Sequence, residues 1–157
     1  VTKVKAVEDI QPAIAKAFDE ADEVVIEAFL DGTEISCGCY KVDGKNIVLP
    51  ITEVVSHNEY FDYDAKYNGQ VEEITPARIP DDVRNRVWAL TSAVYDIIGA
   101  QGIIRIDYFI TEGTKINLLE VNTTPGMTAT SFIPQQVHAA GLDIKDVMTD
   151  IIEDKFK

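Results

Sequence analysis

Two kinds of hydrophobic spacing alternate along the chain. Residues 7–21 and 80–98 carry apolar side chains at three- and four-residue intervals, which predicts two amphipathic helices. Shorter helices are expected at 134–140, which Gly141 would end, and at 143–156. The apolar side of the helix at 80–98 is expected to cover the sheet.

Between these helices, the spacing changes to that of strands. Alternating apolar residues predict three successive strands at 24–30, 34–42 and 46–50. Asp-Gly pairs at 31–32 and 43–44 separate them and are typical of tight turns. The combination of helices with a mainly antiparallel sheet predicts an α+β fold.

A further pair of strands carries the most informative residues. Residues 102–110 and 115–121 are expected to form a hairpin through the polar stretch 111–114. Side chains two apart on a strand share a face, so one face of this hairpin should gather four polar side chains: Arg105, Asp107, Glu120 and Asn122. Leu119 and Val121 are expected to point into the opposite layer.

This polar face has two readings. Carboxylates and an amide, with no His or Cys, are ligands that suit Mg²⁺ or Mn²⁺. The alternative is a solvated hairpin face on which Arg105 and Asp107 pair with neighbouring strands. Pro125-Gly126 and the hydroxyl residues up to Ser131 follow the strand at once, and this arrangement favours the metal site.

Size, composition and charge limit the class of protein. The 157 residues are 46% hydrophobic and 26% charged, which predicts one globular domain over 1–157. A net charge of −13 opposes binding to nucleic acid or anionic membranes. No apolar run reaches the roughly 20 residues that span a bilayer, so we expect a cytoplasmic protein without a membrane partner.

The two cysteines lie close together in an apolar stretch. Cys37 and Cys39 would share one strand face, too near in sequence for an ordinary disulfide, and are expected to be buried and reduced. A zinc site would need more soft ligands than His57 and His138 provide, so zinc is the weaker hypothesis.

Residues 56–78 lose hydrophobic periodicity and become polar and aromatic. A segment of this length in a compact domain is more often functional than a plain connection, so we interpret it as a candidate lid. The alternative is an aromatic cluster that pins a long loop to the core.

Three separated motifs resemble one enzyme family in the order expected for it. The run 120–131, the Arg105-x-Asp107 pair and residues 61–67 (Phe-Asp-Tyr-Asp-Ala-Lys-Tyr) resemble D-alanine–D-alanine ligases of the ATP-grasp superfamily. The resemblance covers nearly the whole chain, but chains of the family are about twice as long. Residues 1–4 resemble the segment just after the family's glycine-rich ATP loop, so we expect a C-terminal fragment whose substrate domain and upstream ATP-binding segment are absent.

The resemblance implies a reaction and a set of ions. The family uses ATP to convert one D-alanine into an acyl phosphate, which the amine of a second D-alanine attacks to give D-alanyl-D-alanine for peptidoglycan. Asp107, Glu120 and Asn122 would hold two Mg²⁺ or Mn²⁺ ions. Arg105 and the Gly126 N–H would stabilise the oxyanion; the plainer readings are an ion pair and a turn requirement.

The resemblance also implies the contacts with substrates. Ser131 and the Phe132 N–H would bind the carboxylate of the second D-alanine, although Ser131 could simply cap a helix. In the candidate lid, Lys66 would contact the γ-phosphate and Tyr67 would close over the second substrate. Glu27, Ala28, Leu30 and Glu34 match the adenosine contacts, where Ala28 replaces a frequent lysine but acts through its main chain.

These implications leave competing functions open. The fragment itself is expected to be inactive alone, and the full-length protein to be a homodimer. One alternative is a module that binds nucleotide without chemistry. Another is an ATP-grasp ligase with a different second substrate, such as D-lactate or D-serine, although ester-forming relatives depart from the pattern that carries Tyr67.

Overall fold

The computed structural model describes residues 1–56 and 71–157. Within them the chain forms two compact units, Val1–Asp31 and Gly32–Lys157, which we describe separately. The expectation of one ATP-grasp domain over 1–157 stays a prediction.

The first unit contains the predicted N-terminal helix. It begins with a 3₁₀ turn, η1 (Val7–Asp9), and continues as α1 (Ile10–Phe18). The predicted strand at 24–30 is wrong, because these residues have no regular secondary structure. Apolar alternation makes a strand possible, but a strand forms only when a neighbour accepts its backbone hydrogen bonds, and no described segment pairs with 24–30.

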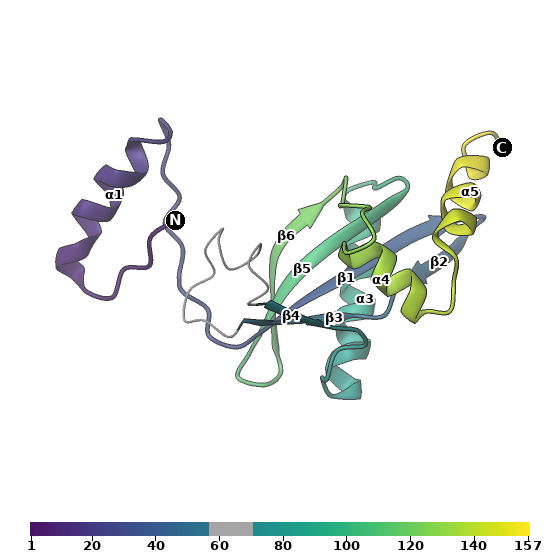
Figure 1. Cartoon of the computed structure of the whole chain (residues 1–157), viewed down its shortest axis with the longest axis horizontal. Helices are drawn as coiled ribbons and strands as arrows, with labels where there is room; N and C mark the ends of the chain where they lie inside the picture. Colours follow the sequence, from purple (N-terminus) through teal and green to yellow (C-terminus); the bar gives the residue numbers. More distant parts are fainter. Residues whose placement is uncertain (57–70) are drawn as a thin grey trace. The chain divides into compact units, whose positions relative to one another are not determined.

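The second unit is built on an antiparallel sheet (Figure 1). The strand order is β4-β3-β1-β5-β6, and β2 also pairs with β1. The strands of the described residues are β1 (Thr33–Val42), β2 (Lys45–Val48), β3 (Thr52–Ser56), β4 (Val71–Ile74), β5 (Ile103–Thr111) and β6 (Lys115–Asn122).

Two of these strands were not predicted. β3 pairs with both β1 and β4, and β4 lies inside the range 56–78, for which the sequence predicts a loop. Both β3 and β4 are short. In β4 the exposed Glu72 and Glu73 interrupt the alternation that marks a strand, so pairing with β3, which sequence periodicity does not report, defines this edge of the sheet.

Helix α3 (Asp81–Ile97) covers one face of the sheet (Figure 1). Its buried Val83 and Val87 belong to the same core cluster as Ile104, Ile106 and Tyr108, the alternate residues of β5 that point to this side. The predicted helix 80–98 is therefore confirmed, with Pro80 as its N-cap residue.

Helices α4 (Phe132–Ala139) and α5 (Ile144–Asp154) pack on the opposite face. A second core cluster joins Ile133 and Val147 of these helices to Tyr40 and Ile103 of the sheet. The predicted α+β class with a mainly antiparallel sheet is confirmed. No helix among residues 1–56 and 71–157 is long and apolar enough to cross a membrane.

The two core clusters determine where the polar hairpin face lies. On β5, Ile103 is covered by α4 and α5, whereas Arg105 and Asp107 follow on the same face at two-residue intervals. Polar side chains therefore begin where the apolar cover of this face ends.

Candidate active site

The hairpin β5–β6 brings the four predicted polar residues together. Arg105 lies opposite Asn122, and Asp107 lies opposite Glu120, so all four side chains share one face, as predicted. A register shift follows at once, because Tyr108 pairs with Leu118.

This register shift makes Leu119 an extra residue in β6. Leu119 is 44% exposed, while Val121 packs against the core on the α3 side. Val121 therefore packs in the opposite layer as predicted, whereas Leu119 is not buried there. A β-bulge of this kind re-aims the neighbouring side chains. Here it sits next to Glu120.

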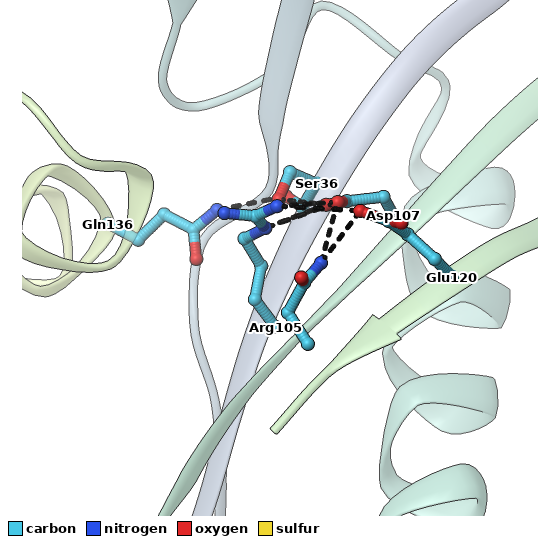
Figure 2. A network of polar contacts seen from close by, with 6 residues as sticks. Ser36, Arg105, Asp107, Glu120 and Gln136 are labelled. Carbon is cyan, nitrogen blue, oxygen red and sulfur yellow. Dashed lines mark hydrogen bonds and ion pairs between the residues drawn. The ribbon is translucent and has the colours of Figure 1, made fainter. Parts of the chain in front are cut away.

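Asp107 is the centre of the cluster and is only 7% exposed (Figure 2). Arg105 donates to it through Nε, at 3.0 Å from Oδ1, and through Nη2, at 2.8 Å from Oδ2. Ser36 on β1 donates its hydroxyl to Oδ1 at 2.7 Å, and Asn122 Nδ2 lies 3.1 Å from Oδ2. This buried carboxylate is held by donors from three strands, which compensates the cost of its burial.

Glu120 is the exposed member of the cluster, with 63% of its side chain accessible. Asn122 Nδ2 donates to Glu120 Oε1 at 3.0 Å as well as to Asp107, so the amide bridges the two carboxylates. Arg105 Nη2 lies 3.9 Å from Glu120 Oε1. The ion pair that we considered as the plainer reading of Arg105 is therefore present.

The residue types of this cluster, two carboxylates and one amide, suit a hard divalent cation. These three groups share one face; the Asn122 amide donates to both carboxylates, and the positively charged group beside them is the Arg105 guanidinium. Among the residues that the structure describes, no group of three or more His, Cys, Asp or Glu side chains is placed to hold a metal. Asp107, Glu120 and Asn122 would therefore need oxygen atoms from a nucleotide or water to complete an octahedral shell.

The start of α4 closes one side of the cluster. The Arg105 guanidinium carbon lies 5.2 Å from the ring centroid of Phe132, the first residue of α4. Ser131 is the N-cap residue by position, but its side chain makes no capping hydrogen bond. Its Oγ accepts from the Thr128 N–H at 3.1 Å instead, so capping does not account for the hydroxyl.

Gly126 lies against Ser131 in the loop between β6 and α4. A Cβ atom at Gly126 would be 2.9 Å from Ser131 Oγ. Gly126 is absent from the glycines with positive φ, so turn geometry does not explain it. The close approach of the loop backbone to Ser131 explains why this residue is glycine.

The predicted adenosine residues fall in different parts of the chain. Glu34 is on β1, two residues before Ser36 and on the same face. Glu27, Ala28 and Leu30 belong to the first unit, where Glu27 and Ala28 are exposed. Lys66 and Tyr67 lie outside the described residues.

Sequence reasoning missed Ser36 and Gln136, which are both fully or almost fully buried. Gln136 on α4 donates to the Ser36 carbonyl oxygen at 2.9 Å and accepts from the Gly38 N–H at 2.9 Å. The only signal available was a polar residue in each of two apolar segments. A partner 100 residues away cannot be read from such a pattern.

The cysteines behave as predicted. Cys37 and Cys39 are buried and free. Burial raises the pKa of the Cys37 thiol to about 12 and that of the Cys39 thiol to about 11. Both are therefore protonated core side chains.

Comparison with known proteins identifies the family. The family described as "D-ala D-ala ligase C-terminus" matches residues 1–153. The chain belongs to this D-alanine–D-alanine ligase family. The resemblance of the three motifs is thus confirmed.

Similar proteins show how much of a ligase this chain covers. A D-alanine–D-alanine ligase from Bacteroides fragilis is 76% identical over 99% of the chain, which spans 48% of that relative. The chain spans about half the length of the curated relatives it matches.

Solved structures of D-alanine ligases share the fold. A D-alanine–D-alanine ligase from Bacillus anthracis, complexed with ATP, matches with a TM-score of 0.76 and 32% identity over 98% of the chain and 49% of its own. VanG D-Ala:D-Ser ligase from Enterococcus faecalis matches with a TM-score of 0.81 and 30% identity over 97% of the chain and 44% of its own.

Proposed function

We propose that the protein ligates two D-alanines at the expense of ATP, through an acyl phosphate, to give D-alanyl-D-alanine for peptidoglycan. The chain would supply the half of the enzyme that binds metal, adenosine and the second substrate, and would be inactive alone. The observation that carries this proposal is the convergence of Arg105, Asp107, Glu120 and Asn122 beside the start of α4. Family membership supports the same reaction.

The acidic residues would organise the phosphates of ATP. Asp107, Glu120 and Asn122 would hold two Mg²⁺ or Mn²⁺ ions, which offset phosphate charge when bound. The buried Asp107 is fixed by donors from three strands, whereas the largely exposed Glu120 accepts one hydrogen bond, from Asn122, and would reorient more easily when ions bind. Glu120 is therefore the better candidate for a bridging ligand.

The residues beside this cluster would bind the second D-alanine and stabilise the charge that develops in the reaction. Arg105 and the Gly126 N–H would stabilise the oxyanion formed when the second amine attacks the acyl phosphate. Ser131 and the Phe132 N–H would hold the carboxylate of that second D-alanine. The contact between Arg105 and Phe132 supports this arrangement, because it joins the two groups of residues directly.

The remaining contacts involve ATP. Glu27, Ala28, Leu30 and Glu34 would bind adenosine, Lys66 would contact the γ-phosphate, and Tyr67 would cover the second substrate. The similarity to a ligase that was solved with ATP supports this part of the proposal. A cytoplasmic location, where ATP is available, and a homodimer of the full-length protein belong to the same proposal.

A chimera tests the proposal. Residues 1–157 would replace the matching half of the Bacteroides fragilis ligase, with that intact ligase as the positive control. Phosphate release and dipeptide formation would be measured with ATP, Mg²⁺ and D-alanine or L-alanine. Turnover that depends on D-alanine supports the ligase. Nucleotide binding without phosphate release, while the control is active, would favour a non-catalytic module.

A different second substrate is the other candidate. The similarity to VanG D-Ala:D-Ser ligase favours testing D-serine, and D-lactate extends the test to ester formation. The chimera would be assayed with D-alanine plus each competitor, and the products separated by mass. Preference for the mixed product over D-alanyl-D-alanine at equal concentrations would replace the proposed substrate but not the reaction class.

A further inference from the structure

Gln136 is a buried polar side chain that the proposed reaction does not use. It lies on α4, has no exposed surface, and makes three hydrogen bonds to the sheet. Its amide oxygen accepts from the Gly38 N–H at 2.9 Å, and its Nε2 donates to the Ser36 carbonyl at 2.9 Å and to Thr52 Oγ1 at 3.0 Å. Three of the four hydrogen bonds that this amide can make are thus directed at β1 and β3.

These bonds hold α4 close to the sheet at a defined point. A Cβ atom at Gly38 would lie 2.6 Å from Ile133 Cδ1 and 2.8 Å from Gln136 Oε1. The helix therefore packs where β1 has no side chain. Apolar packing against Ile133 is not directional, whereas hydrogen bonds to backbone groups set the rotation and register of α4.

The residue that Gln136 contacts on β1 is also the residue that holds Asp107. Ser36 presents its carbonyl to Gln136 and its hydroxyl to Asp107 Oδ1, as Figure 2 shows. The same helix begins at Phe132, directly after Ser131. Two hydrogen bonds, both made by Ser36, thus connect the buried Asp107 carboxylate to α4. This helix starts at the residues that we propose to bind the second D-alanine.

We propose that Gln136 is a positioning residue that fixes Ser131 and Phe132 relative to the Asp107 carboxylate, and so sets the affinity for the second amino acid. This inference rests on the proposed function. It assigns no contact between Gln136 and any substrate. By holding α4 in place, Gln136 would keep the second D-alanine at the correct distance from the acyl phosphate.

The test uses the chimera with Gln136→Met, which keeps the volume of the side chain but removes its hydrogen bonds. The D-alanine concentration at half-maximal rate should rise about tenfold, corresponding to about 1.4 kcal/mol, while the KM for ATP changes less than about twofold. A residue that only stabilises the fold would lower the amount of active enzyme and leave both concentrations unchanged.

Two further variants keep the result interpretable. Val147→Ala removes buried volume from the same core cluster on α5, and should lower stability without moving either half-maximal concentration. Thr52→Val removes one of the three partners of Gln136 in a side chain of similar shape. It should shift the D-alanine dependence in the same direction by about twofold to threefold, and it replaces Gln136→Met if that variant does not fold.

The outcomes separate this inference from the proposed function. A chimera that makes no dipeptide overturns the proposed function and the inference with it. An active chimera in which Gln136→Met and Thr52→Val leave the D-alanine dependence unchanged overturns the inference alone. The same holds if the KM for ATP rises as much as the half-maximal D-alanine concentration.

Discussion

Ser36 and Asp107 face each other across β1 and β5, and the serine hydroxyl donates to Asp107 Oδ1 at 2.7 Å. Ser36 is 1% exposed, so no water replaces this donor easily. The hydroxyl thereby orients a carboxylate that we propose as a metal ligand. Residues that hydrogen-bond to a metal ligand commonly change the affinity of the site for the metal.

Replacing Ser36 with alanine should weaken metal use by the chimera. Loss of a hydrogen-bond partner of a metal ligand typically lowers metal affinity about 10–100-fold, so the Mg²⁺ concentration at half-maximal rate should rise about tenfold or more. Ser36→Thr keeps the hydroxyl and should stay near the parent value. Titration of the rate with Mg²⁺ at saturating ATP measures the effect. Equal Mg²⁺ dependence in all three proteins would contradict the role given to Ser36.

Glu120→Gln tests the exposed carboxylate of the cluster. The amide keeps the shape of Glu120 but removes the negative charge that a bridging ligand needs, so ATP-dependent phosphate release should become undetectable. Because Glu120 is a largely exposed side chain, the free energy of unfolding should change by no more than about 0.5 kcal/mol. Normal turnover in this variant would show that Glu120 is only part of a solvated face.

Two glycines separate a binding effect from a stability effect. A methyl group at Gly126 would press on Ser131 Oγ, so Gly126→Ala should raise the D-alanine concentration at half-maximal rate with little loss of stability. Gly113, in the turn between β5 and β6, has a φ of +75° and open space around it. Gly113→Ala should therefore cost about 1 kcal/mol of stability and leave the kinetics unchanged. The reverse pattern would contradict the close-approach argument for Gly126.

The sequence was sufficient to predict those parts of the fold and of the site that depend on a local pattern. Strand alternation placed Arg105 and Asp107 on one face, and a short polar turn implied that β5 pairs with β6, so the cluster with Glu120 and Asn122 followed. Helical spacing likewise located α3 and, within a few residues, α4 and α5. These features depend on residues that are neighbours along the chain or across one hairpin.

The errors arose where distant partners decide the structure. Residues 24–30 have strand-like alternation but no strand beside them, and β4 has poor alternation but pairs with β3. The bulge at Leu119 breaks the two-residue period without any glycine or proline to signal it. The contact of Gln136 with Ser36 joins residues 100 positions apart. Only the packed sheet specifies these relationships.

Burial of the Cys37 thiol gives the protein a defined response to alkaline pH. Desolvation raises the pKa of Cys37 to about 12, above its ordinary value near 9. Between these two values the unfolded chain releases a proton that the native chain keeps. The contribution of this thiol to stability is complete below about pH 9 and declines as pH rises, by about 1.4 kcal/mol per pH unit.

Urea unfolding of the 157-residue chain at pH 8.0 and 10.5 measures this decline. Other groups also titrate in this range, so the comparison is with Cys37→Ala, which should be less stable at pH 8.0 but should lose about 2 kcal/mol less between the two pH values. Alkylation by iodoacetamide at pH 8.0 gives an independent reading, because a buried, protonated thiol reacts slowly until the chain unfolds. Rapid labelling of Cys37 in the native chain, together with equal pH dependence in the variant, would contradict the burial of this thiol.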